Sequence, residues 1–444
     1  MSATGFLDAC GFFPAAGGTA DFVVSAAITG YQTPASAGAV NGAVYSYRAQ
    51  SSNMSEWEIG FGAYATGTTT LARTTVVASS TGSKVNFSAP PSVYITALSA
   101  DLQNAALLDN GQFGFHNRLI NPNGQIWQRV NSGAAAITDG TYAFDRWYGL
   151  VQSAGVTASQ VTNAENGTPY MMRLSQANAT AQRFGIAQAI ESVNIIDLRG
   201  QDVTLSARVR MSASTTLRYA ILEWTGTADA ITRDVVNNWT STTYTPGNFF
   251  IASNVAVIAA GSVALTANTL ASVELTGTAS GSMNNVYVVF WTDSAQAQNV
   301  TLDIGKVQLE IGSSATPLAL RDVGFELLMC QRYFEKTYSL EASPGTAYGT
   351  FNGGGAPFSY VYGTTSYAPV FFWGFKSDKR ATPSITIYSP YTGASGNVRR
   401  QVASADVAAY VASSSSSSAG ISVNNVSIAA GEYIYGHATA NSEL

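Results

Sequence analysis

Short runs in which apolar and polar residues alternate recur along most of the chain. Residues 203–211 (VTLSARVRM) place an apolar side chain at every second position, and residues 300–311 (VTLDIGKVQLEI) repeat the pattern. A period of two is typical of a strand with one face in a core and the other in solvent. Residues 286–291 (VYVVFW) are apolar throughout, which indicates a more fully buried strand. The pattern therefore predicts β-structure over most of the chain.

The spacing of these runs predicts how the strands are connected. They recur roughly every 10 to 20 residues, separated by Gly, Thr, Ser and Asn, without the long helices that a βαβ fold needs between its strands. We therefore expect an all-β, multidomain chain of the β-sandwich or jelly-roll kind. No repeat of 20 to 50 residues is visible, which argues against a β-helix.

Two short helices are expected to connect the domains. Residues 98–108 (LSADLQNAALL) place their leucines and alanines on one face, with Ser99 as a candidate N-cap. Residues 322–334 place Val323, Leu327, Cys330 and Phe334 at helical spacing, and Asp322 at the start complements the helix dipole. Both segments coincide with changes in composition along the chain.

A chain of 444 residues is too long for one ordinary core. We expect an N-terminal β-domain over residues 1–97, a helical linker over 98–130, a jelly-roll domain over 131–320, and a short helix plus a C-terminal β-domain over 321–444. In the first domain, strands are expected at Phe22–Ile28, Val44–Arg48, Trp57–Tyr64 and Val93–Thr96.

Composition excludes several classes of partner. Charged residues make up 11% of the chain, the formal net charge is -5, and no basic run occurs, so we expect no nucleic-acid partner. No apolar run is long enough for membrane insertion. The low charge suits a surface partly covered by copies of the same chain. The two cysteines, Cys10 and Cys330, are expected to be ordinary buried thiols, and the first residues show no secretion signal.

Few residues point to catalysis. His116 and His437 are the two histidines, and neither has metal-ligand spacing or lies in a nucleophile motif. No metal site is predicted. A glycoside hydrolase needs two carboxylates across one groove, which spacing along the chain cannot test. The candidates are Glu191, Glu223, Asp229, Asp234, Asp303 and Glu310. Most are isolated acids on alternating strands, so the simpler interpretation is that each is solvated or satisfied locally.

Sugar binding has a better candidate site. Aromatic rings bury the apolar C–H faces of sugars while polar side chains bond their hydroxyls. Trp224 and Trp239 flank a polar loop, so both tryptophans could form a platform, with donors and acceptors from Asp229, Arg233, Asp234, Asn237 and Asn238. The alternative is that both tryptophans fill a core or a contact between protomers. Trp147 and Trp291 are expected to pack in the core, as are most of the rings crowded into residues 348–375.

Several motifs resemble one family. They are NRLINPNGQIWQRV (117–130), TYAFDRWYGL (141–150), VQLEIGSSATP (307–317), CQRYFEK (330–336), and WEIGFGAYATGTTTLARTTVVASS (57–80). Together they resemble the fibre and spike proteins of tailed bacteriophages and gene transfer agents that carry a carbohydrate-binding-like β-domain. The ending HATANSEL departs from the family pattern, with His437 where a tryptophan is common.

The resemblance implies a tail or head fibre, synthesised in the cytoplasm of a bacterial host and assembled into the virion. It implies a homotrimer whose N-terminal domain binds other virion proteins and whose β-domains bind a host-surface polysaccharide. No cofactor is expected; a structural calcium is left open, without named ligands. Two alternatives remain: a decoration or adaptor protein that uses the sugar-module fold only for assembly, and a polysaccharide depolymerase.

Overall fold

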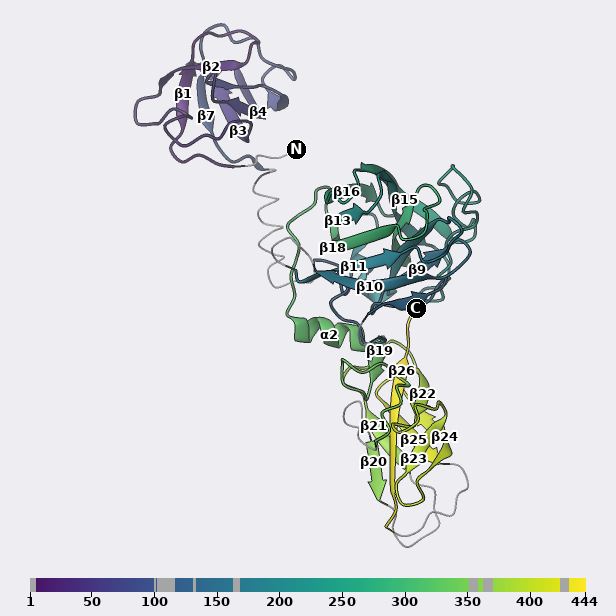
Figure 1. Cartoon of the computed structure of the whole chain (residues 1–444). Helices are drawn as coiled ribbons and strands as arrows, with labels where there is room; N and C mark the ends of the chain where they lie inside the picture. Colours follow the sequence, from purple (N-terminus) through teal and green to yellow (C-terminus); the bar gives the residue numbers. More distant parts are fainter. Residues whose placement is uncertain are drawn as a thin grey trace. The chain divides into compact units, whose positions relative to one another are not determined.

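The computed structural model describes residues 5–99, 101, 116–130, 133–162, 168–350, 358–361, 370–423 and 431–444. The chain forms two compact units, Met1–Gly114 and Phe115–Leu444. Almost every described element is a β-strand, which confirms the predicted all-β class (Figure 1). The helix expected over 98–108 lies almost entirely outside the described residues, and the expected domain boundaries stay predictions.

Unit 1 is a small antiparallel barrel. Its strands run in the order β3-β7-β1-β2-β5-β4-β6, and an additional pairing of β3 with β4 closes the sheet, leaving β6 beside β4. Closure leaves few unpaired strand edges. All four strands expected here are confirmed, as β2, β3, β4 and β7. The bounds are β1 Gly11–Pro14, β2 Phe22–Ala27, β3 Val44–Gln50, β4 Trp57–Ala65, β5 Thr70–Leu71, β6 Thr75–Ser79 and β7 Ser92–Ile95.

A buried ion pair lies inside this barrel. Glu58 and Arg73, both from the motif at residues 57–80, have fully buried side chains 2.5 Å apart. Glu58 also accepts hydrogen bonds from the Tyr47 hydroxyl at 2.7 Å and the Val85 N–H at 2.8 Å. Burial alone raises the pKa of Glu58, but the hydrogen bond from Arg73, followed by those from Val85 and Tyr47, outweighs burial and holds the pKa below its usual range. The motif therefore supplies a charged group at the centre of the barrel.

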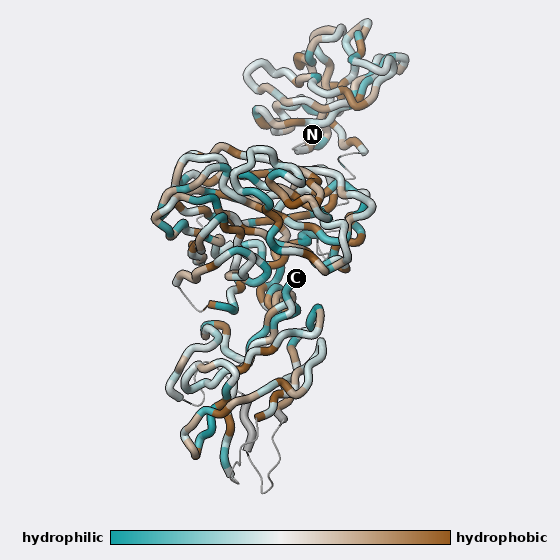
Figure 2. Tube along the Cα trace, turned by 90° about the vertical axis from the view of Figure 1, so that its right-hand side faces the viewer, coloured by the Kyte–Doolittle hydropathy of each residue, from teal (hydrophilic) through white to brown (hydrophobic). Residues whose placement is uncertain are grey.

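Unit 2 begins with a sandwich of two antiparallel sheets. One sheet has the order β16-β13-β18-β11-β10-β8 and the other has the order β15-β14-β17-β12-β9. Apolar segments cross the interior between them (Figure 2). The bounds are β8 Ala135–Ile137, β9 Tyr148–Val151, β10 Val156–Thr162, β11 Tyr170–Ser175, β12 Phe184–Ile190, β13 Asp202–Met211, β14 Thr215–Trp224, β15 Val255–Leu265, β16 Ala271–Thr278, β17 Asn285–Thr292 and β18 Thr301–Ile311.

The five-stranded sheet is apolar on both faces. On β14, Leu217 and Ile221 face the core between the sheets, whereas Leu222 and Trp224 belong to a second core on the outer face. β17, the strand at residues 286–291, alternates in the same way, with Val288 inside and Trp291 outside. Continuous apolar sequence is the signature of a strand buried on both faces. The expectation that this strand is fully buried is confirmed.

A helix joins the sandwich to the last sheet. Helix α2 spans Val323–Gln331, and Asp322 caps it by accepting hydrogen bonds from the N–H groups of Gly324 and Phe325. The prediction of a helix here is confirmed, but its end is wrong: the helix stops at Gln331, and Phe334 begins strand β19 (Phe334–Lys336). Arg332 is the C-cap, and all three residues of β19 are buried, so Phe334 packs as a strand residue.

The last sheet is organised around strand β26. Four strands, β19, β20, β22 and β23, pair with β26. From β23 the sheet continues through β24 and β25 to β21. Strand β20 begins the segment FSYVYG (358–363), and strand β21 lies in the segment APVFFWGF (368–375). The side chains of β20 are not described. The bounds are β19 Phe334–Lys336, β20 Phe358–Val361, β21 Val370–Gly374, β22 Ser384–Tyr388, β23 Asn397–Arg400, β24 Ala405–Ser414, β25 Ser418–Val423 and β26 Tyr433–Asn441.

The motifs of unit 2 meet at one junction between the sandwich and the last sheet. Asp145 accepts a hydrogen bond from the Gln128 N–H at 2.7 Å and forms an ion pair with Arg129 at 3.1 Å. Arg129 also contacts Glu443 at 2.9 Å, and the Gln128 amide reaches the Phe334 carbonyl at 2.8 Å. The expected packing of Trp147 is confirmed, since its ring is fully buried. The motifs thus supply contacts that hold the sandwich and the last sheet together.

Candidate functional site

The loop expected to bind sugar lies across the outer face of the five-stranded sheet. Its apolar residues, among them Val235, Val236 and Phe249, are buried against that face. Phe249 stacks on Trp291 with ring centroids 5.1 Å apart. Leu444 belongs to the same core. The sheet face is therefore covered by the chain's own residues.

Both candidate tryptophans pack in this covering. Trp224 is 7% exposed, and its Nε1–H donates to the Thr227 carbonyl at 3.0 Å. Trp239 is half-buried, edge-on to Phe249 at 5.7 Å. Trp224 is thus a residue of the outer core, whereas Trp239 packs against that core with part of its surface exposed.

The polar residues of the loop hold its own backbone in place. Asp229 accepts hydrogen bonds from the backbone and hydroxyl of Ser192 at 2.9 and 2.8 Å. Arg233 donates to the Gly140 carbonyl at 3.0 Å, and Asp234 accepts from the Val236 N–H at 3.2 Å.

The two asparagines act in the same way. The Asn237 amide donates to the carbonyls of Gly247 and Asn248, and Asn238 accepts from the backbone and hydroxyl of Thr240 at 2.9 and 2.8 Å. These contacts are those of turns. A role of this loop in sugar binding stays a prediction.

Each of the candidate hydrolase carboxylates also has a local partner. Glu191 pairs with Arg332 at 2.7 Å and accepts from the Tyr333 hydroxyl at 2.7 Å. Glu223 accepts from the Ser280 N–H at 2.9 Å, and Glu310 accepts from Thr316 at 2.8 Å. Asp303 lies between two arginines. These contacts assign structural roles to the acids.

His437 and the two cysteines are buried, whereas His116 is half-buried. His437 is fully buried and stacks on Tyr338 at 3.8 Å between ring centroids. Burial raises the pKa of Cys10 to about 11 and that of Cys330 well above its usual range. Both thiols are therefore protonated at neutral pH and poor nucleophiles. Within the described part of the chain, no group of three or more His, Cys, Asp or Glu could hold a metal ion. The described helices include none long and apolar enough to cross a membrane.

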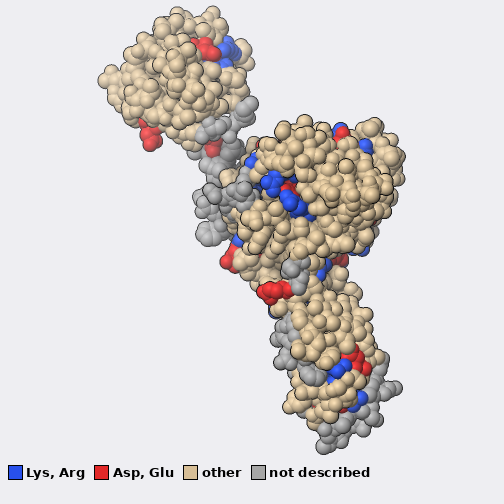
Figure 3. All heavy atoms as spheres, in the orientation of Figure 1, with Lys and Arg blue, Asp and Glu red and all other residues tan. Residues whose placement is uncertain are grey.

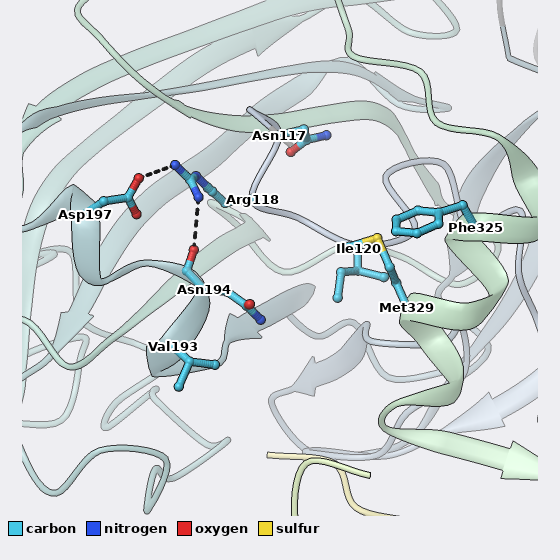
Figure 4. Close-up of a pocket in the computed structure, with 8 residues that line it drawn as sticks. All are labelled: Asn117, Arg118, Ile120, Val193, Asn194, Asp197, Phe325 and Met329. Atoms are coloured by element: carbon cyan, nitrogen blue, oxygen red, sulfur yellow. Dashed lines mark hydrogen bonds and ion pairs between the residues drawn. The ribbon is translucent and has the colours of Figure 1, made fainter. Parts of the chain in front are cut away.

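One pocket of unit 2 combines apolar and polar walls (Figure 4). It has a volume of about 350 Å³. One wall comes from α2, and the other comes from Arg118 and the short helical turns η1 (Ser192–Asn194) and η2 (Ile196–Leu198). The lining residues are Asn117, Arg118, Ile120, Val193, Asn194, Asp197, Phe325 and Met329.

The polar wall is organised by one arginine. Arg118 forms an ion pair with Asp197, whose side chain is 51% exposed, and donates to the Asn194 carbonyl at 3.3 Å. Across the pocket, the ring of Phe325 is 42% exposed, beside Met329 (Figure 4). An accessible ring opposite fixed donors and acceptors is the arrangement that suits a sugar.

This pocket was not predicted from the sequence. Phe325 lies outside the helical stripe expected to be apolar, and Arg118 lies in a motif that resembles the family without a stated role. One signal was available: residues 323–330 of the helix are apolar at nearly every position, so some of these side chains had to face away from the core.

No family model and no curated protein matches this sequence. Similar solved structures include the enzymatically active domain of tailspike protein 4 of bacteriophage CBA120, with 12% identity and a TM-score of 0.27, covering 45% of this chain and 22% of that one. A putative sugar-binding protein from Bacteroides thetaiotaomicron has 12% identity and a TM-score of 0.27, covering 44% of this chain and 100% of that one. The C-terminal family 22 carbohydrate-binding module of Clostridium thermocellum Xyn10B has 10% identity and a TM-score of 0.25, covering 41% and 94%. Similarity this low carries no argument about function, which rests on the residues.

Proposed function

We propose that this chain is a non-enzymatic carbohydrate-binding protein, and that unit 2 binds a host-surface glycan in the pocket of Figure 4. The observation that supports it is the exposed ring of Phe325 opposite the ion pair of Arg118 and Asp197. The ring offers an apolar surface to the C–H face of a sugar, while the pair and Asn194 offer donors and acceptors to its hydroxyls. The volume lies at the small end of the range for ligand sites, about 300–1,000 Å³, so the pocket suits a short stretch of glycan.

The biological setting is part of the same proposal. The motifs at residues 57–80, 117–130 and 330–336 support a virion fibre or spike, with unit 1 binding other virion proteins and three copies per fibre. A small sugar site binds weakly by itself, and several copies on one particle raise the avidity without new contacts. A monomeric mass in native mass spectrometry of the purified chain would contradict the trimer.

The test compares two substitutions on the same helix. Phe325→Ala removes a ring that lines the pocket, whereas Leu328→Ala removes an equally exposed side chain, 42%, that does not line it. In titrations against host-surface polysaccharide fragments, we expect Phe325→Ala to weaken binding about tenfold and Leu328→Ala to leave it unchanged. Size-exclusion chromatography of the polysaccharide should show unchanged length; shortened polymer would favour the depolymerase instead.

A second candidate function is assembly alone. Exposed apolar side chains lie on the segments that form the pocket, η1, η2 and α2 with the residues before it, and exposed apolar patches mark contacts between proteins. They are Val193, Ile196, Leu320, Val323, Phe325 and Leu328. A decoration or adaptor protein that uses this surface for contacts between copies predicts a different result: Phe325→Ala and Leu328→Ala would both change the oligomeric mass, and neither would affect glycan binding.

A further inference from the structure

The solvent-facing side of the six-stranded sheet carries a row of polar residues at matching positions. Arg173 on β11 lies directly opposite Asp303 on β18, and Asp303 lies opposite Arg210 on β13. Ser159 on β10 continues the row on the other side of Arg173. Residues directly opposite in neighbouring strands share one face of the sheet, so these four side chains form one line across four strands.

Asp303 holds both arginines in fixed positions. The two carboxylate oxygens bind Arg173 at 2.6 and 2.9 Å, and Oδ2 also binds Arg210 at 2.9 and 2.7 Å. Asp303 is 1% exposed, while the side chains of Arg173 and Arg210 are 31% and 25% exposed. One buried carboxylate therefore fixes two partly exposed guanidinium groups and leaves one positive charge in excess. Each guanidinium has five N–H donors, of which Asp303 occupies two.

The surroundings add charge and hydroxyl groups. Arg208, two residues from Arg210 on the same strand, lies on the same face and donates to Ser272. Exposed Glu274 on β16 lies opposite Ser206 of β13. Ser175 and Thr301, which lie opposite each other two residues along β11 and β18, form the neighbouring pair on the same face. Figure 3 shows basic side chains gathered around acidic ones over β13, β18 and β11. Among the described residues, Arg173, Arg208 and Arg210 thus lie on one side of this sheet around the buried Asp303, in a chain whose net charge is -5.

We propose that this face binds the carboxylate groups of an acidic polysaccharide. The planar guanidinium group binds carboxylates through two parallel N–H bonds, and the contact of Arg173 with Asp303 is already of this kind. The neighbouring serine and threonine hydroxyls suit the sugar hydroxyls that flank each carboxylate. This site is separate from the pocket of Figure 4, and it rests on the proposed function only in taking the ligand to be a polysaccharide.

A nucleic acid fits this face less well. Duplex DNA presents one charge for about every 1.7 Å of its length and is bound by long basic stripes. Here the basic residues form one short group on an acidic chain, and the row contains no aromatic ring on which a base could stack. Separate carboxylates along a sugar chain match a short group of this kind.

The test uses variants that preserve the buried carboxylate. Arg173→Gln leaves Asp303 paired with Arg210, and Arg208→Gln does not touch that pair, so the double variant Arg173→Gln/Arg208→Gln should fold. We expect it to bind alginate at least tenfold more weakly than the native chain, with a shallower dependence on salt. Asp303→Asn keeps an acceptor between the arginines and removes one negative charge, so it should bind alginate more tightly. Arg199→Gln is the control, because Arg199 donates to Met283 and Asn284 away from this row.

Three results would overturn the inference. They are native-like alginate affinity in the folded double variant, weakening of the same size in Arg199→Gln, and binding of duplex DNA at least as tight as that of alginate with the same dependence on the variants. Binding of neutral host-glycan fragments reports on the pocket, and the double variant should leave it unchanged. The neutral fragments therefore test the proposed pocket, alginate tests the proposed arginine face, and either proposal can fail without the other.

Discussion

Arg146 forms a buried ion pair with Glu443, 297 residues later in the chain. Their side chains are 1% and 4% exposed, and the guanidinium of Arg146 also lies 3.6 Å from the centre of the Tyr333 ring. Burial opposes the charge on Arg146, but Glu443 outweighs burial and raises the pKa of the guanidinium above its usual range. The pair and the Tyr333 contact therefore join three segments that lie far apart along the chain.

Removal of Glu443 should be strongly destabilising. Glu443→Ala leaves Arg146 buried without its counter-ion, so we expect a loss of about 3–5 kcal/mol in the free energy of unfolding. Urea denaturation followed by tryptophan fluorescence measures it. The matched control is Asp197→Asn, which breaks a half-exposed pair and should cost less than about 1 kcal/mol. Equal losses in the two variants would contradict a special role for the junction.

Lys336 should make the stability of unit 2 depend on pH. Its ammonium group is buried and donates to the carbonyls of Leu340 and Ala342 at 3.0 and 2.7 Å. Burial lowers the pKa of Lys336 to about 8, from about 10.4 in an unfolded chain. Between these values the unfolded chain binds the extra proton, so stability should rise as the pH rises through this window.

The measurement is urea denaturation at several pH values from 7.5 to 9.5. Lys336→Met removes the titrating group and should flatten the rise. Lys379, whose pKa burial also lowers, keeps part of the slope in both proteins. Identical slopes in the native chain and in Lys336→Met would show that Lys336 has an ordinary pKa.

Two adjacent rings on β21 should respond oppositely to truncation. Phe371 is 5% exposed and packs in the core of the last sheet, whereas Phe372 is 79% exposed. Phe371→Ala should therefore cost about 3–5 kcal/mol of stability, and Phe372→Ala should stay within about 0.5 kcal/mol. Thermal unfolding of the two variants side by side decides this, and a large loss from Phe372→Ala would mean that this ring is covered.

Truncating Trp224 should cost stability without affecting sugar binding. It is almost fully buried in the outer core, so Trp224→Ala should lose about 3–5 kcal/mol, and the half-buried Trp239 should lose less. Both variants, at temperatures where they are folded, should keep the glycan affinity of the native chain. Loss of affinity in folded Trp239→Ala would return the site to this loop.

The sequence predicted the strands better than the surfaces they expose. Alternation identified β13 and β18, and continuous apolar sequence identified β17, because the period of side chains along a strand is local information. The same information does not say what covers the outer face of a sheet. Trp224 and Trp239 resembled a sugar platform because the polar residues between them resembled an exposed loop. In the structure Asn237 and Asn238 bond within the loop, and Asp229 and Arg233 bond Ser192 and Gly140.

The pocket and the arginine row depend on long-range placement. Arg118 and Phe325 line one pocket from positions about 200 residues apart, and Arg173 meets Asp303 only through the pairing of β11 with β18. Charge counts averaged over the chain hide a local excess of arginine of this kind. The start of α2, by contrast, followed from neighbouring residues: Asp322 was expected near the start of the helix, where its charge complements the dipole, and it is the N-cap.

The position of Glu443 and Leu444 also determines when this protein can finish folding. A ribosome releases residue 146 long before it has made residue 443, so the nascent sandwich lacks Leu444 in its outer core and holds an uncompensated arginine throughout the synthesis of the last domain. Contacts of such long sequence separation also slow the final step. We therefore expect the growing chain to be more prone to aggregation and proteolysis until its last two residues are made, and a product that lacks Glu443 and Leu444 to be degraded faster than the full chain.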